Sequence, residues 1–186
     1  MTRPELPLLF LDVDGPLIPF GGTSRRRPGE RSDQSGHTPP TSDSNPLLTK
    51  IDPRLGPRLA ALPCELVWAT SWMSDANACI APLLGLPELP VVDWPESSDQ
   101  DKLDAWHGLH WKTRRLVDWA NGRSFIWMDD EHTGDDQTWV RTHHQGQALL
   151  HRVDPRRGLT DADFNTLHGW FDDLKTTRLN QASSGP

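Results

Sequence analysis

The stretch that most constrains the fold is residues 6–20, which read LPLLFLDVDGPLIPF. Its apolar run is short and continuous, which is typical of a strand buried in a parallel sheet. The run leads into two carboxylates two positions apart, Asp12 and Asp14, and Gly15-Pro16 then ends the strand. Carboxylates at the end of a buried strand are costly unless a partner compensates their charge. Taken alone, the segment also fits an ordinary Asp-Gly-Pro turn without chemical function.

The rest of the chain predicts strands that alternate with helices. This alternation predicts an α/β fold: a three-layer, Rossmann-like parallel sheet of about five strands flanked by helices, with right-handed crossovers. We expect one domain at residues 1–180 and a disordered tail at residues 181–186. The strands after the first are expected at residues 65–69, 89–92, 124–128 and 148–153, and the helices at residues 53–62, 74–84, 111–120 and 136–143 and from residue 160 onward.

A long polar insertion follows the first predicted strand. Residues 21–46 contain no aliphatic or aromatic residue and are rich in glycine, proline and serine. Such a segment buries too little surface to offset the entropy of ordering it, so we expect a flexible insertion there. A second polar segment, residues 93–110, is too short for a domain, and its middle is expected to be a loop or a short irregular helix. The sequence therefore predicts no full cap domain over the sheet.

Composition excludes several classes of protein. The 186 residues carry a formal net charge of −7, which argues against non-specific coating of nucleic acid and gives no reason to expect binding to an anionic membrane. Two cysteines do not make a disulfide framework. No apolar run reaches membrane-spanning length, and the first one is interrupted by acids, unlike a secretion signal. We expect a cytoplasmic protein, and its oligomeric state stays open.

Polar side chains follow three of the predicted strands, and a lysine lies at the start of the helix before the strand at 124–128. In parallel sheets, ligands bind beyond the carboxyl ends of the strands, so these side chains should meet on one edge. Converging carboxylates repel one another and call for a hard cation, and an all-oxygen set favours Mg²⁺ over Zn²⁺. The residues concerned are Asp12, Asp14, Thr70, Lys112, Asp129 and Asp130.

The same residue types suit phosphoryl chemistry. A threonine hydroxyl and a fixed ammonium can hold the non-bridging oxygens of a phosphoryl group. One carboxylate can act as nucleophile and form an aspartyl-phosphate. A second carboxylate can protonate the leaving oxygen and later activate water.

In order and spacing, these motifs resemble the haloacid dehalogenase (HAD) superfamily. The resemblance is carried by LDVDG at 11–15, WAT at 68–70, Lys112, and WMDD at 127–130. The chain is also similar to the small capless HAD domains that occur alone in bacteria or fused to RNA-repair proteins, in which TSW and DDE strings recur.

This resemblance implies the catalytic roles. Asp12 would be the nucleophile and a Mg²⁺ ligand. Asp14 would be the general acid and base, and its backbone carbonyl would be a second ligand of the metal. Lys112 would neutralise Asp12 and the bound phosphoryl group.

The remaining motif residues would bind substrate and metal. Thr70 would hold the phosphoryl oxygens, with Ser71 as the fallback, and Gly15 belongs to the same substrate-binding set. Asp129 and Asp130 would complete the metal site, Asp130 directly and Asp129 through water or the lysine.

The resemblance implies a Mg²⁺-dependent phosphomonoester hydrolase that works through an aspartyl-phosphate. Its phosphorylated substrate would be a small molecule such as a nucleotide, or a nucleic-acid end. Two alternatives stay open: a phosphoryl transferase of the same fold, and a catalytically silent binding or regulatory module. A phospho-receiver domain would place its lysine after the last acid, whereas here Lys112 precedes Asp129, and a Walker-type kinase would need a glycine-rich loop that is missing.

Overall fold

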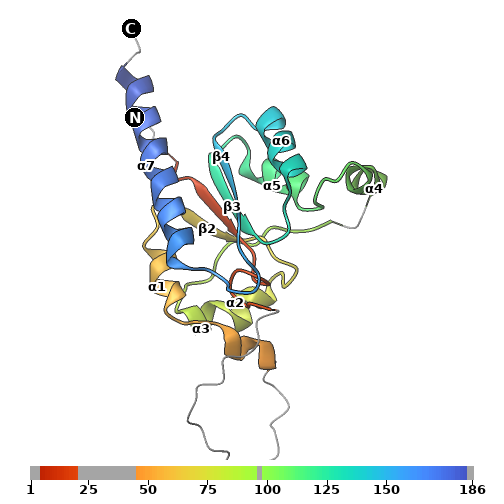
Figure 1. Cartoon of the computed structure of the whole chain (residues 1–186), viewed down its shortest axis with the longest axis vertical. Helices are drawn as coiled ribbons and strands as arrows, with labels where there is room; N and C mark the ends of the chain where they lie inside the picture. The colour runs from red at the N-terminus through yellow and green to blue at the C-terminus, as the bar shows by residue number, and fades with distance from the viewer. Residues whose placement is uncertain (1–4, 21–44, 96–97, 184–186) are drawn as a thin grey trace, which may run out of the picture.

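The computed structural model describes residues 5–20, 45–95 and 98–183, the last three of them by their backbone only. Four strands form one parallel sheet in the order β2-β1-β3-β4 (Figure 1). The predicted α/β fold is therefore confirmed, and the strand order reverses at β1, where α/β sheets bind their ligands. The strands are β1 (Leu8–Leu11), β2 (Glu65–Trp68), β3 (Phe125–Asp129) and β4 (Ala148–Arg152).

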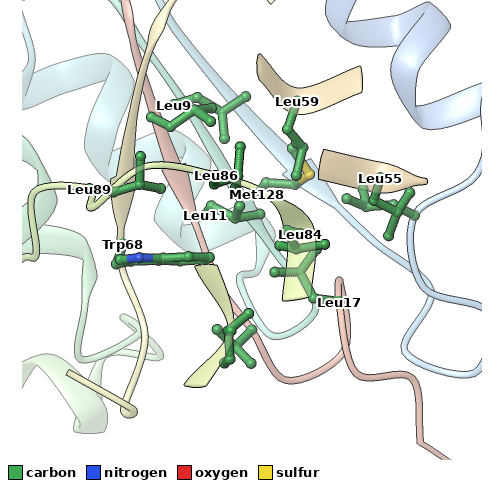
Figure 2. Close-up of a cluster of buried hydrophobic side chains, with 14 of the residues drawn as sticks. Leu9, Leu11, Leu17, Leu55, Leu59, Trp68, Leu84, Leu86, Leu89 and Met128 are labelled. Carbon is green, nitrogen blue, oxygen red and sulfur yellow. The ribbon is translucent and has the colours of Figure 1, made fainter. Parts of the chain in front are cut away.

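Helices cover both faces of the sheet, as Figure 1 shows. Side chains alternate between the faces of a strand, so each strand of the sheet contributes to two cores. Helices α1, α3 and α7 pack on the face of Leu9, Leu11, Trp68 and Met128, the cluster drawn in Figure 2, and α5 and α6 pack on the opposite face. The helices are η1 (Pro46–Lys50), α1 (Leu55–Ala60), α2 (Asp75–Cys79), α3 (Ala81–Leu84), α4 (Asp99–Trp106), α5 (Thr113–Ala120), α6 (Gly134–His143) and α7 (Asp161–Ser183).

The strand expected at residues 89–92 is reduced to a single bridge between Val91 and Trp68. The backbone N–H of Trp68 donates to the Pro90 carbonyl, and the backbone N–H of Val92 donates to the Trp68 carbonyl. Prolines at 87, 90 and 95 have no N–H to donate, so a longer ladder cannot form. The sheet consequently has four strands in the described part of the chain.

The helix expected at residues 74–84 is two short helices that meet at Ile80. Pro82 has no N–H for the Ala78 carbonyl, which breaks the helical ladder there. Ser74 makes no side-chain capping bond to α2, and Leu83 is exposed. Helix α3 ends at Gly85, whose backbone is left-handed, with φ of 65°.

The polar segment at 93–110 contains a regular helix, α4, which Ser98 and Asp101 cap reciprocally. The expected insertion lies outside the described residues except for its last two positions, of which Asn45 caps η1 with its side chain. Helix α7 runs to Ser183, beyond the expected start of the tail, and residues 184–186 lie outside the described part. None of the described helices is long and apolar enough to cross a membrane.

Helix α7 begins at a hydrogen-bonded carboxylate. The Thr160 N–H and hydroxyl donate to Asp163 Oδ2 at 2.7 and 2.6 Å, and His151 Nε2 donates to Asp163 Oδ1 at 2.8 Å. Burial alone would raise the pKa of Asp163, but these hydrogen bonds hold it below its usual value. The helix presents a buried apolar stripe, formed by Phe164, Leu167, Phe171 and Leu174.

Candidate active site

The carboxyl ends of three strands meet on one edge of the sheet. Leu11 at the end of β1 is in register with Trp68 of β2 and with Met128 of β3. The residues that follow these strands therefore emerge side by side. The structure thus brings Asp12, Thr70, Asp129 and Asp130 to one edge, where their motifs placed them, and all four side chains are buried.

Lys112 joins the first and the third of these strands. Its Nζ lies 2.8 Å from Asp12 Oδ2 and 2.7 Å from Asp129 Oδ2. The lysine is 3% exposed, Asp12 7% and Asp129 0%, so the three charges are nearly withdrawn from water. Lys112 immediately precedes α5, so the start of this helix fixes the position of the lysine backbone.

Burial and charge act on these groups in opposite directions. Burial raises the pKa of Asp12 to about 7, against the attraction of the Lys112 ammonium and together with the repulsion from Asp129. Burial would also raise the pKa of Asp129, but Lys112 and the Glu131 N–H lower it below its usual value. Burial would lower the pKa of Lys112, but the two carboxylates raise it. One ammonium cannot balance two ionised carboxylates, so a second cation could bind to this cluster.

The two acids after β3 differ in what binds them. Asp129 accepts from Lys112 and from the Trp127 indole at Oδ2, and from the Glu131 N–H at Oδ1. Within the described part of the chain, no other residue donates a hydrogen bond to the Asp130 carboxylate. Burial raises the pKa of Asp130, and the neighbouring Asp129 charge adds to the effect. Asp130 is therefore the carboxylate with free lone pairs for a cation.

A glycine lets the loop after β1 approach this acid. Gly15 has φ of +86°, and a Cβ at this position would lie 2.7 Å from the Asp130 carboxyl carbon. Larger residues would collide with the carboxylate and would resist the left-handed backbone. Position 15 thus requires glycine for the loop after β1 to lie against Asp130.

Indole N–H groups position two of the remaining site residues. Trp72 Nε1 donates to Asp14 Oδ2 at 3.0 Å, and Trp94 Nε1 donates to the Thr70 carbonyl at 2.9 Å. Asp14 is half-buried and is not one of the three carboxylates, Asp12, Asp129 and Asp130, that have one oxygen each within 4.8 Å of the others. The Thr70 hydroxyl accepts from the backbone N–H of Trp72 at 3.3 Å.

The two hydroxyl side chains considered for the phosphoryl group differ in exposure. Thr70 is fully buried, whereas Ser71 is exposed. The structure therefore places only one of them in direct reach of solvent. Their order of preference stays a prediction.

A second network, which the sequence motifs did not reveal, holds the segment before Lys112. Asp136 is fully buried and accepts at Oδ1 from the His110 N–H at 2.8 Å and from the Thr113 hydroxyl at 2.6 Å. Its Oδ2 accepts from the Thr133 N–H at 2.7 Å, which caps α6. This carboxylate ties the start of α5 to the start of α6. The sequence signal was only the capping pair Thr133 and Asp136, which explains the helix but not its second partner.

His110 contacts two neighbours in this network through its ring nitrogens. The backbone N–H of Lys112 donates to His110 Nδ1 at 3.2 Å, and His110 Nε2 lies 3.2 Å from Glu131 Oε2. His110, Asp129 and Glu131 lie close enough to share a cation, but these hydrogen bonds account for their arrangement.

The carboxylates of Asp12, Asp129 and Asp130 have the composition of a Mg²⁺ site. One oxygen from each lies within 4.8 Å of the others. Hard oxygen donors with a surplus of negative charge suit Mg²⁺, which binds through one or two carboxylates and completes its shell with water or phosphate. The residues present therefore fit Mg²⁺, the metal that the sequence predicts.

Comparison with known proteins agrees with this geometry. Residues 8–164 match the model of the HAD domain in Swiss Army Knife RNA repair proteins, a span that reaches from β1 into α7. Neither a curated protein nor a solved structure gives a significant match. The match covers most of the chain and includes every motif residue described above. The chain belongs to the HAD domain family of Swiss Army Knife RNA repair proteins.

Proposed function

We propose that this HAD domain is a Mg²⁺-dependent phosphomonoester hydrolase that acts through an aspartyl-phosphate on Asp12. The observation that carries the proposal is the buried cluster in which Lys112 bridges Asp12 and Asp129 while the Asp130 carboxylate stays without a donor from another described residue. The family description, which names RNA repair, supports nucleotides or nucleic-acid ends as the substrate class.

Asp12, Asp130 and the backbone carbonyl of Asp14 would hold the metal. Asp129 accepts three hydrogen bonds already, so its role is to position Lys112 and to reach the metal through water. When bound, Mg²⁺ would neutralise the charge of the phosphoryl group as it is transferred.

The reaction would take two steps at the sheet edge. Asp12 Oδ attacks phosphorus, the bond to the leaving oxygen breaks, and Asp14 donates a proton to that oxygen. Asp14 then takes a proton from water, which attacks the aspartyl-phosphate and releases inorganic phosphate with Asp12 regenerated. Lys112 stabilises the negative charge of Asp12 before attack and of the phosphoryl oxygens during it.

Neighbouring side chains would prepare these steps. The Trp72 indole holds one oxygen of Asp14 at 3.0 Å and leaves the other free to exchange a proton. Thr70, or Ser71 in its place, would donate to a phosphoryl oxygen, and Gly15 would give the substrate access to the loop backbone. A phosphoryl transferase would share the first step and differ only in the acceptor of the second.

The test is phosphate release from a panel of p-nitrophenyl phosphate, nucleotides, sugar phosphates and RNA or DNA carrying 5′- or 3′-phosphate ends. We expect turnover with Mg²⁺, none with EDTA, and a loss of at least about 1,000-fold in Asp12→Asn. Asp52→Asn removes a carboxylate that pairs with the exposed Arg54 and serves as the matched control. Substantial turnover by Asp12→Asn would exclude Asp12 as nucleophile. Phosphate transferred to an added alcohol instead of water would identify a transferase, and a folded, metal-binding chain that releases nothing would support the silent module.

A further inference from the structure

A cavity of about 260 Å³ lies between Trp94 and Pro95, the start of α4, and α5 with the tryptophan before it. Trp94 and Trp111 form one wall, and Arg114, Arg115 and Asp118 from α5 lie around the rest. A larger cavity, of about 470 Å³, lies between α6, β4 and Trp170. None of the proposed catalytic or metal-binding residues lines either cavity, but the smaller one is lined by Trp94, which contacts Thr70, and by Trp111, the neighbour of Lys112. We therefore consider the smaller cavity for a part of the substrate.

The tryptophan wall is shared with the proposed phosphate site. Trp94 donates its indole N–H to the carbonyl of Thr70 at 2.9 Å. Trp111 directly precedes Lys112, whose Nζ lies 5.4 Å from the centre of the Trp111 ring. A substrate whose phosphate lies between Thr70 and Lys112 would thus place its next chemical group against these two indoles.

The wall has the chemistry of a site for a planar ring. The two indoles meet edge to face, with ring centroids 4.8 Å apart and an angle of 72° between the planes. Trp111 is 46% exposed, which is unusual for so large an aromatic side chain and leaves almost half of it open to a ligand. Nucleobases stack on aromatic faces and on guanidinium planes.

One of the two arginines is open to a ligand. Arg114 forms an ion pair with Asp104 through two of its nitrogens. Arg115 uses only its Nε, which donates to the Asp93 carbonyl at 2.9 Å. Its two terminal nitrogens have no hydrogen-bond partner among the described residues. A purely apolar ligand would gain nothing from this guanidinium, whereas a nucleobase or the next phosphate of a strand would.

We propose that the cavity bounded by Trp94, Trp111 and Arg115 binds the base of the nucleotide whose phosphate is attacked by Asp12. The inference rests on the proposed function and deepens it, because it makes nucleotide phosphates, free or at an RNA end, the substrates that this site selects over phosphate esters without a base. Trp111 would supply the stacking surface, and Arg115, which lines the cavity, would donate from its terminal nitrogens.

The experiment compares Trp111→Leu with wild type on five substrates. They are adenosine 5′- and 3′-monophosphate, an oligoribonucleotide with a 5′- or a 3′-phosphate, and ribose 5-phosphate, which lacks a base. The readout is the ratio of kcat/KM for each base-containing substrate to that for ribose 5-phosphate. We expect this ratio to exceed one in wild type and to fall about 5- to 150-fold in Trp111→Leu, the range expected for one stacked base. Trp106→Leu is the matched control, since Trp106 is 86% exposed and does not line the cavity.

The outcomes separate the two proposals. Metal-dependent turnover with no preference for a base, or with a preference that Trp111→Leu retains, would overturn the inference and keep the proposed function. A higher ratio for the oligonucleotides than for the mononucleotides would support the inference with the RNA end as the source of the base, and equal ratios would support it with the nucleotide alone.

A second measurement tests binding of the base directly, and it applies even if wild type releases phosphate from no substrate. The Trp111 indole N–H signal is identified in the NMR spectrum by its disappearance in Trp111→Leu, and Asp12→Asn is titrated with adenosine 5′-monophosphate. A selective shift of that signal, without turnover of any substrate by wild type, would support the binding site and refute the phosphatase. No shift and no base preference would overturn the inference outright. Thermal unfolding confirms that each variant is folded.

Discussion

Replacing Lys112 by methionine removes the ammonium of the buried cluster and keeps most of the apolar stem. In the native chain, Nζ lies 2.8 Å from Asp12 Oδ2 and 2.7 Å from Asp129 Oδ2. The two carboxylates that would remain are 7% and 0% exposed, so water cannot replace the lost charge. Each would then lack the cation that offsets the cost of burying it.

The expected loss follows from this burial. Breaking a buried ion pair by removing one partner costs about 3–5 kcal/mol of the free energy of unfolding. For a chain of this size, each kcal/mol lowers the Tm by about 2–4 °C, so the Tm should fall by roughly 6–20 °C. Lys102→Met is the matched control, because Lys102 pairs with Asp99 at 2.7 Å on the surface, where both side chains are largely exposed. Its loss should stay below about 1 kcal/mol.

The assay is urea and thermal unfolding near neutral pH in EDTA. A loss in Lys112→Met that equals the loss in Lys102→Met would refute the argument, because it would mean that the native cluster does not depend on the ammonium. Adding Asp129→Asn to Lys112→Met should restore part of the stability, since it removes a buried carboxylate that has lost its cation. Mg²⁺ should raise the Tm of Lys112→Met more than that of wild type, because the metal can supply the missing positive charge.

Three further perturbations address the rest of the structure. Gly15→Ala should lower the free energy of unfolding by roughly 1–3 kcal/mol and weaken Mg²⁺ binding in calorimetric titration, because its backbone φ is +86° and its Cβ would collide with Asp130; an unchanged Tm and affinity would contradict this. Thr70→Ala should reduce kcat/KM for phosphate release by about 10- to 100-fold and Ser71→Ala by much less, and the reverse pattern would assign the phosphoryl contact to Ser71. Asp163→Asn should cost about 1 kcal/mol of the free energy of unfolding at pH 6. Hydrogen bonds lower the native pKa of Asp163 below its unfolded value of 3.8, so the difference between the variant and wild type should vanish in urea unfolding as the pH falls through and below 3.8. A difference independent of pH would refute the role of its charge.

The sheet was predictable because its central strands, β1 and β3, are short and buried on both faces. Continuous apolar runs such as Leu8–Leu11 and residues 125–128 report this burial directly, and the polar residues after them mark the carboxyl edge. The bridge at Val91 was less predictable. Its segment is apolar enough for a strand, and the missing proline N–H groups limit it to one bridge.

The groups that hold the site in shape were not predictable, because their partners are distant in the sequence. The nine tryptophans of the chain are all compatible with a core role, and nothing local distinguishes those whose N–H groups meet the site. Trp72 reaches Asp14 across 58 positions, and Asp136 reaches His110 across 26. Such contacts depend on the register of β1, β2 and β3 and on where α5 and α6 begin. Motifs therefore identify the groups proposed to react, whereas only the folded chain shows which indoles and carboxylates fix their orientation. A phenylalanine at position 72 would keep the apolar packing and release Asp14, so the indole N–H has a role that the aromatic ring alone cannot fill.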